Sequence, residues 1–164
     1  MPTRPLLSLP HMDGRVHPAA ASASIERILC VDDDSDGLEV LELLLVSEGF
    51  EVITARNGAE ALLRVQEQLP NLIITDYTMP GMTGLDLCKR LRASRVMRLI
   101  PIILYTGVSL PADLRLYDCI VTKPADLCAL AIQIRVLLAA IPDTRRRVGR
   151  VGVTSASCRN RPVR

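Results

Sequence analysis

The stretch that decides the fold is Leu72-Ile73-Ile74-Thr75-Asp76-Tyr77-Thr78-Met79-Pro80-Gly81. Its first residues are mostly branched and apolar, and they run directly into one aspartate before Pro80 and Gly81 interrupt the chain. A short apolar run bounded by such breakers predicts a buried strand of a parallel sheet. Asp76 would then lie at the carboxyl end of the strand, where open α/β sheets bind ligands. On this stretch alone, a loop-capping role for Asp76 is an equally good interpretation.

Four other apolar runs are bounded in a similar way, and patterns of helical period lie between them. The strands predicted from the five runs cover residues 28–31, 52–55, 72–75, 102–105 and 119–122. The helices predicted between these strands, and after the last of them, cover residues 37–48, 58–69, 84–94, 111–117 and 126–141. Strands and helices that alternate in this way predict an α/β protein with one doubly wound parallel sheet.

Side chains that can cap a helix precede three of the predicted helices. Ser35 and Asp36 are the candidates for the first helix, and Asn57 and Thr83 stand at the starts of the second and third. Their side-chain oxygens can accept hydrogen bonds from the N–H groups that a first turn leaves free. Gly49 is expected to end the first helix.

Composition divides the chain into three segments. Residues 1–24 are rich in proline, alanine and serine and lack the apolar stretch of a signal peptide, so we expect a disordered tail. Residues 25–141 carry the alternating pattern and a net charge of −5, and they are expected to form a single domain. Residues 142–164 hold seven arginines and one aspartate, which predicts a second disordered tail that is strongly basic.

Composition also excludes several kinds of site. The chain has 164 residues, of which 49% are hydrophobic and 23% are charged, as is typical of a soluble globular protein. It has no tryptophan and only one phenylalanine, Phe50, so an aromatic platform for single-stranded nucleic acid is not expected. Both histidines, His11 and His17, lie in the first segment, which excludes a histidine-based metal site or acid–base pair from residues 25–141.

Cysteine usage indicates a reducing compartment, and we expect a cytoplasmic protein. The number of cysteines is odd, and no two have the spacing of a metal site or a redox motif. Most lie inside apolar runs, where a thiol behaves as a small hydrophobic group. The five are Cys30, Cys88, Cys119, Cys128 and Cys158.

Polar side chains follow four of the predicted strands at the point where each strand ends. Right-handed crossovers place the carboxyl ends of all parallel strands on one edge of a sheet, so these side chains can share one pocket. They are Asp32, Asp33, Asp76, Thr106 and Lys123. Three carboxylates in one pocket require a cation, and a set of oxygen ligands without histidine or cysteine favours Mg²⁺.

The chemistry that these residue types support is phosphoryl transfer, which needs positioning and charge neutralisation. Asp76 would be the nucleophile that forms an aspartyl-phosphate. The Lys123 ammonium suits a phosphoryl oxygen, and the Thr106 hydroxyl can donate a hydrogen bond to another. Taken singly, Lys123 could be a surface lysine at a turn, and Thr106 could close a turn at the end of a strand.

With these residues in place, the chain resembles the receiver domain of bacterial two-component response regulators. The resemblance covers about residues 26–141, which is the whole predicted domain. Four segments in the right order and at the right spacings carry it: Val31-Asp32-Asp33-Asp34, residues 76–84, residues 101–107, and Thr122-Lys123-Pro124. It implies a flavodoxin-like fold whose five strands have the order 2-1-3-4-5. It also implies that Asp76 is phosphorylated by the phosphohistidine of a histidine kinase or phosphotransfer protein.

The resemblance also implies roles for the pocket residues. The implied magnesium ligands are the carboxylates of Asp32, Asp33 and Asp76 and the main-chain carbonyl of Thr78. Thr106 would be the switch hydroxyl, and Lys123 would bind the phosphoryl group. The Lys123–Pro124 peptide bond is expected to be cis.

The chain departs from the family pattern at two places. The family usually has an aromatic switch residue three positions before the lysine, and here that position is Ile120. The segment from Thr106 to Lys123 is also several residues shorter than usual, so the helix between the fourth and fifth strands must be small. These departures leave the phosphoryl-transfer residues intact but affect the surface through which a signal would pass.

We expect a stand-alone phosphorylatable receiver, with no DNA-binding domain, that signals by binding a downstream protein. It would not be an enzyme beyond self-catalysed, Mg²⁺-dependent phosphotransfer and slow autodephosphorylation. Two alternatives remain open. Asp32-Asp33-Asp34 contains the D-x-D pattern of haloacid-dehalogenase-like phosphatases, although that interpretation leaves Asp76 unexplained. The basic tail could instead tether the protein to nucleic acid or an anionic surface.

The last predicted helix has two apolar sides. One side should pack on the sheet and carries Leu127, Leu130, Ala131, Ile134, Leu138 and Ile141. The other side carries Cys128, Ile132 and Val136, which repeat at helical spacing and predict a homodimer contact or a docking surface. The helix is too short and, with Arg135, too polar to span a membrane.

Overall fold

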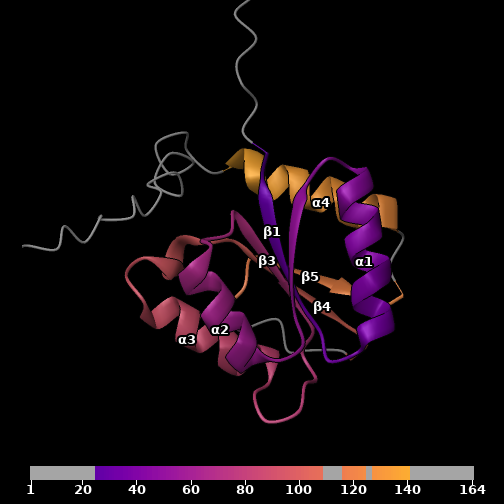
Figure 1. The fold of residues 1–164 in the computed structure, drawn as a ribbon. Helices are drawn as coiled ribbons and strands as arrows, with labels where there is room; N and C mark the ends of the chain where they lie inside the picture. Colours follow the sequence, from indigo (N-terminus) through magenta and orange to yellow (C-terminus); the bar gives the residue numbers. More distant parts are fainter. Residues whose placement is uncertain (1–24, 109–115, 125–126, 141–164) are drawn as a thin grey trace, which may run out of the picture.

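The computed structural model describes residues 25–108, 116–124 and 127–140 (Figure 1). Five strands form one parallel sheet: β1 (Arg27–Val31), β2 (Glu51–Ala55), β3 (Leu72–Thr75), β4 (Ile102–Thr106) and β5 (Cys119–Thr122). Their order is β2-β1-β3-β4-β5, so the predicted flavodoxin-like topology is confirmed. Each predicted strand is present, with ends that differ from the prediction by at most one residue.

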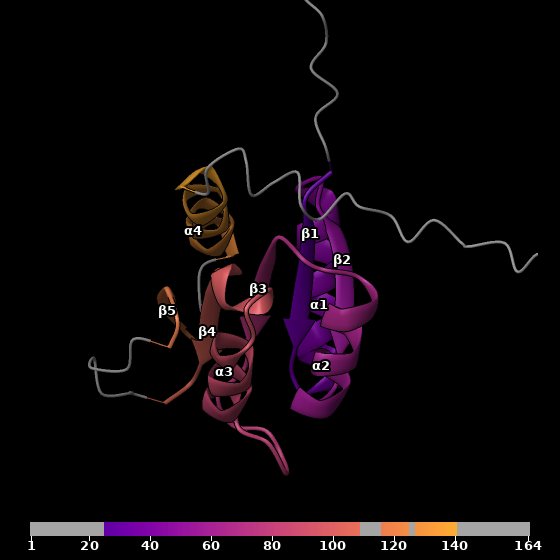
Figure 2. The same cartoon turned by 90° about the vertical axis from the view of Figure 1, so that its left-hand side faces the viewer.

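Helices cover both faces of the sheet (Figures 1 and 2). Helices α1 (Ser35–Ser47) and α4 (Leu127–Ala140) pack on one face, where they share a hydrophobic cluster with alternate residues of the strands. Helices α2 (Gly58–Glu67) and α3 (Gly84–Ala93) pack on the other, and the short 3₁₀ helix η1 (Met97–Leu99) follows α3. We call these two clusters the α1–α4 layer and the α2–α3 layer.

The central strands show why apolar and polar residues do not alternate along these runs of the sequence. In β1, Ile28 and Cys30 point into the α1–α4 layer, whereas Leu29 and Val31 point into the α2–α3 layer. All four are at most 2% exposed. A parallel strand that is covered on both faces must be apolar along its whole length, and this is what the sequence contains.

The cap of α1 corrects one sequence prediction. Ser35 and Asp36 were expected to cap this helix, but Ser35 is already its first residue and Asp34 is the N-cap. The Asp34 carboxylate accepts a hydrogen bond from the Asp36 backbone N–H at 3.2 Å. The other two caps are confirmed, because Asn57 accepts from the Glu60 N–H and Thr83 accepts from the Asp86 N–H.

Several predictions concern residues outside the described ranges. The tails expected at 1–24 and 142–164 lie there, and so does most of the helix expected at 111–117. The last two residues of that predicted helix, Leu116 and Tyr117, are described and are not helical. None of the helices in the described ranges is long and apolar enough to cross a membrane.

Candidate functional site

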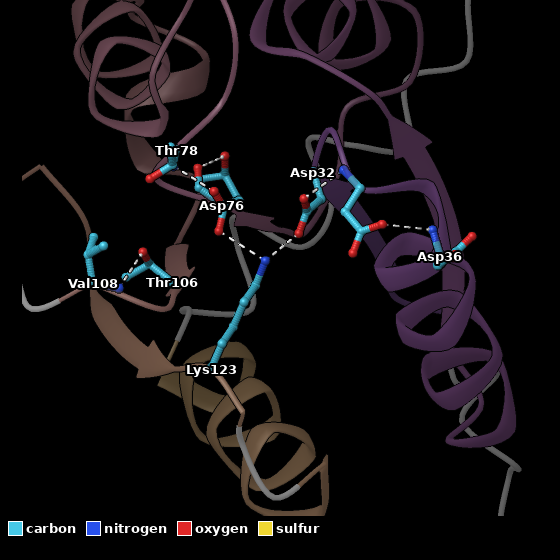
Figure 3. A network of polar contacts seen from close by, with 9 residues as sticks. Asp32, Asp36, Asp76, Thr78, Thr106, Val108 and Lys123 are labelled. Carbon is cyan, nitrogen blue, oxygen red and sulfur yellow. Dashed lines mark hydrogen bonds and ion pairs between the residues drawn. The ribbon is translucent and has the colours of Figure 1, made fainter.

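The carboxyl edge of the sheet brings the predicted pocket residues together (Figure 3). Three of them, Asp32, Asp76 and Lys123, are fixed by backbone hydrogen bonds that continue the sheet pairing past a strand end. The Asp76 N–H donates to the Val31 carbonyl at 2.8 Å, and the Asp32 N–H donates to the Ala55 carbonyl at 3.1 Å. The Lys123 N–H donates to the carbonyl of Thr106 at 2.9 Å. The positions of these side chains therefore follow from the register of the sheet.

Three carboxylates form the centre of the pocket. Asp32, Asp33 and Asp76 each offer an oxygen, and these oxygens all lie within 4.8 Å of one another. Asp32 is 7% exposed and Asp76 is 8% exposed, whereas Asp33 faces solvent. A backbone N–H orients each buried carboxylate, that of Asp34 for Asp32 at 3.0 Å and that of Thr78 for Asp76 at 2.5 Å.

Lys123 reaches between the two buried carboxylates. Its Nζ lies 2.5 Å from an oxygen of Asp32 and 3.0 Å from an oxygen of Asp76, as Figure 3 shows. Burial alone would lower the pKa of Lys123, but the hydrogen bonds to Asp32 and then Asp76 outweigh burial and raise the pKa above its usual value. The lysine is therefore a charged component of the pocket and not a surface lysine at a turn.

Lys123 should stabilise the fold when no metal is present. Lys123→Ala would leave two buried carboxylates without their ammonium partner, so we expect a loss of ~1–2 kcal/mol in the free energy of unfolding. Urea denaturation in a chelator measures this loss. Lys89→Ala is the control, because it also removes an ammonium that pairs with one aspartate, but at an exposed position. Equal stability of the Lys123 variant and wild type would contradict the prediction.

The set of donor atoms in the pocket fits a magnesium ion. Carboxylate oxygens are the ligands that Mg²⁺ prefers, and the three oxygens already lie close enough to share one ion. One ammonium against three carboxylates leaves a negative balance that a divalent cation would neutralise. Asp32, Asp33 and Asp76 would hold the ion, and the Thr78 main-chain carbonyl remains a further candidate ligand.

Thr106 ends β4 on the same edge and is 1% exposed. Its Oγ1 accepts a hydrogen bond from the Val108 N–H at 3.3 Å. This bond closes the strand-end turn that the sequence allows at Thr106 as an alternative to a functional role. This bond uses the oxygen as an acceptor, so the hydroxyl hydrogen can still be donated to a ligand. The turn and a role in phosphoryl binding are compatible.

Two features of the site were missed by the sequence analysis. A Cβ at Gly84 would lie 2.1 Å from the Asp76 carbonyl oxygen, so the first residue of α3 packs directly on the backbone of the central aspartate. The ring of Tyr105 has its centroid 5.1 Å from the Nζ of Lys123. Gly84 lies in residues 76–84, one of the segments that carry the resemblance, but nothing in the sequence indicates its distance from Asp76.

Of the two departures from the family pattern, the structure describes the one at Ile120. Ile120 is half-buried and, like Leu116 and Tyr117, packs against the α2–α3 layer. Most of the short connection between β4 and β5 lies outside the described ranges. The peptide bond between Lys123 and Pro124 is cis, as predicted.

Comparison with known proteins finds receiver domains and response regulators of similar sequence and fold. The family model of the response regulator receiver domain matches residues 28–131. A receiver domain of a histidine kinase from Syntrophus aciditrophicus superposes with a TM-score of 0.67 at 35% identity, over 72% of this chain and 93% of that one. The response regulator TrrA of Thermotoga maritima, solved in complex with Mg²⁺ and BeF, gives a TM-score of 0.65 at 34% identity, over 69% of this chain and 99% of that one.

Longer relatives match over part of their length. The DNA-binding response regulator MtrA of Mycolicibacterium smegmatis is 36% identical over 118 residues, which are 69% of this chain and 50% of that protein. The phosphate regulon regulatory protein PhoB of Rhizobium meliloti is 42% identical over 83 residues, which are 51% of this chain and 37% of that protein. The chain thus spans half or less of the length of these relatives. On the match to residues 28–131, the chain belongs to the receiver domain family of two-component response regulators.

Proposed function

We propose that this domain accepts a phosphoryl group on Asp76 from the phosphohistidine of a histidine kinase or a histidine phosphotransfer protein, and that it then signals by binding a downstream protein. The observation that carries the proposal is the position of the Lys123 ammonium between the two buried carboxylates of a three-carboxylate pocket. A pocket of this kind can bind a divalent cation and a phosphoryl group together.

The transfer assigns a role to each pocket residue. An Asp76 carboxylate oxygen attacks phosphorus, an O–P bond forms, and the P–N bond of the phosphohistidine breaks with its electron pair going to the imidazole. The N–H of Thr78 holds the Asp76 side chain in one orientation. Lys123 and the Thr106 hydroxyl contact phosphoryl oxygens. Mg²⁺, when bound, neutralises charge that develops on those oxygens.

The direct test is labelling with a small acyl phosphate in place of the kinase. With Mg²⁺, the intact mass of the protein should rise by one phosphoryl group, and with a chelator it should not. The added group should be lost in mild base, as an acyl phosphate is. Folded protein that takes up no phosphoryl group at saturating donor and Mg²⁺ would refute the proposal.

Asp33 should contribute to magnesium binding although it is the exposed member of the cluster. Asp33→Ala removes a ligand oxygen and a negative charge from the pocket, so we expect Mg²⁺ affinity to fall at least about tenfold, which is ~1.4 kcal/mol. A titration followed by calorimetry measures the change. Asp36→Ala is the matched control, because it removes an exposed carboxylate in the first turn of α1. Equal effects of the two variants would exclude Asp33 as a ligand.

The outer side of α4 supports a proposal about partners. Ile132 is 60% exposed and Val136 is 57% exposed, and Cys128 is exposed on the same side. Leu130, Ala131, Ile134 and Leu138 are buried, as the helical pattern predicts, whereas Ile141 and the side chain of Leu127 lie outside the described part. We propose that the outer stripe, Cys128, Ile132 and Val136, mediates self-association or docking, and that phosphorylation changes its strength.

The stripe can be tested by charge insertion. The double variant Ile132→Glu with Val136→Glu should weaken self-association about tenfold or more. Burying the stripe against a second copy would then remove two carboxylates from water. Sedimentation with and without a phosphoryl mimic measures the monomer–dimer equilibrium. Gln133→Glu adds a charge at an exposed position between them and should have little effect. A wild type that is monomeric in both states, with partner recovery unchanged in the double variant, would contradict the proposal.

A further inference from the structure

Tyr105 joins the pocket to the core of the domain. It is the penultimate residue of β4 and lies opposite Val121 of β5 in the register. The residue is half-buried, and it packs against the α1–α4 layer. Ile120, at the position where the family usually has an aromatic residue, belongs to the α2–α3 layer on the opposite face. Tyr105 is therefore not a displaced copy of that aromatic residue.

The Tyr105 ring is also a third partner of the Lys123 ammonium. The Nζ lies 5.1 Å from the ring centroid while it contacts Asp32 and Asp76. An ammonium within about 6 Å of an aromatic ring is attracted by the negative face of the ring. Together the contacts confine the end of a side chain that has four rotatable bonds and would otherwise lose much entropy on binding.

We infer that Tyr105 is a positioning residue for Lys123, and that its ring keeps the ammonium at the pocket when the carboxylates are occupied by a metal ion and a phosphoryl group. The inference rests on the proposed function, because it concerns the step in which Lys123 contacts phosphoryl oxygens.

The partners of Lys123 differ in how they respond to that step. In the described structure the two carboxylates dominate, because ion pairs at 2.5 and 3.0 Å are stronger than a cation–π contact. When Asp76 carries a phosphoryl group as an acyl phosphate and Asp32 holds a divalent cation, the two carboxylates attract the ammonium less, and the phosphoryl oxygens become its anionic partners. The aromatic face of Tyr105 is uncharged and offers no oxygen to a metal ion or a phosphoryl group. Its attraction for the ammonium therefore persists when both are bound. Tyr105 should thus keep the ammonium at the pocket while its anionic partner changes from the carboxylates to the phosphoryl oxygens.

Beryllofluoride, a phosphoryl mimic, provides the measurement. At saturating Mg²⁺, Tyr105→Leu should weaken beryllofluoride binding about three- to tenfold, which is the range that a cation–π contact represents. Tyr105→Phe keeps the ring and should bind within about twofold of wild type. Mg²⁺ affinity without beryllofluoride should be nearly unchanged in both variants. A Phe variant as weak as the Leu variant would assign the effect to the hydroxyl and overturn the inference.

A double-mutant cycle separates positioning from loss of packing. In a Lys123→Ala background, Tyr105→Leu should cause no further loss of beryllofluoride affinity, because the ring then has no ammonium to hold. An equal loss in both backgrounds would show that the residue acts only through the core, and it would refute the inference. The outcome is distinct from failure of the proposed function, which would appear as wild-type protein that binds no beryllofluoride with Mg²⁺.

Discussion

Asp76→Asn should abolish phosphorylation by a small acyl phosphate. The substitution keeps the size of the side chain, and the amide oxygen can still accept the Thr78 N–H that orients Asp76. The amide is not a nucleophile at phosphorus, so the acyl phosphate cannot form. It also carries no charge, so the pocket binds the metal ion less tightly. Intact mass spectrometry of wild type and variant under the same labelling conditions measures the difference, which should be complete loss.

The control for this result is Asp36→Asn, which makes the same change in an exposed side chain of α1 and should label like wild type. Circular dichroism should show that both variants are folded. Undiminished labelling of the Asp76 variant would show that another side chain is modified. Peptide mapping would then test Asp32 and Asp33 first.

Gly84→Ala should cause a larger loss of stability than the same substitution at any other glycine in the described part of the chain. The new Cβ would lie 2.1 Å from the Asp76 carbonyl oxygen and 3.1 Å from the Tyr77 Cα, so backbone and not a flexible side chain would have to move. Overpacking at such a position typically costs 1–3 kcal/mol, and we expect about 2–3 kcal/mol in the free energy of unfolding. Urea denaturation of wild type and variant measures the loss.

The same variant should also lose function, because the movement displaces the residue proposed to accept the phosphoryl group. Gly84 donates its N–H to the Tyr77 carbonyl at 2.9 Å, so a shift at position 84 also pulls on the segment that follows Asp76. The labelling rate should therefore fall in protein that remains folded. Gly107→Ala is the control, since a Cβ there meets no described atom within 4 Å. Similar stability of the two variants would refute the argument.

The sheet could be predicted from the sequence because its signals are local. Each strand is an apolar run that ends at a polar residue or a breaker, and the alternation with helices then fixes the parallel topology. The cap of α1 could not be predicted, because Asp34, Ser35 and Asp36 can all cap a helix. The choice depends on where the chain leaves β1, and the contact of the Asp32 carboxylate with the Asp34 N–H is part of that exit.

The part of the candidate site that could be predicted is the part whose residues are brought together by the order and direction of the strands. Asp32, Asp76 and Lys123 follow strands that share an edge, so their proximity required no knowledge of side-chain directions. The contact of the Tyr105 ring with Lys123 and the close approach of Gly84 to Asp76 depend on distances across the fold. Residues that are ordinary in sequence, a strand tyrosine and a helix-start glycine, acquire their importance only through these contacts.

The separation of Asp32 and Lys123 by 91 residues has a consequence for biosynthesis. A ribosome releases β1 and β3, with the acidic residues that follow them, before it releases Lys123. A nascent chain that pairs these strands early must therefore hold adjacent carboxylates without their ammonium. Cellular Mg²⁺ can neutralise this intermediate, so the ion that the mature pocket is suited to bind would also assist cotranslational folding. Arrest of translation just before β5 should yield a chain whose protease resistance depends on Mg²⁺ more strongly than that of the released protein.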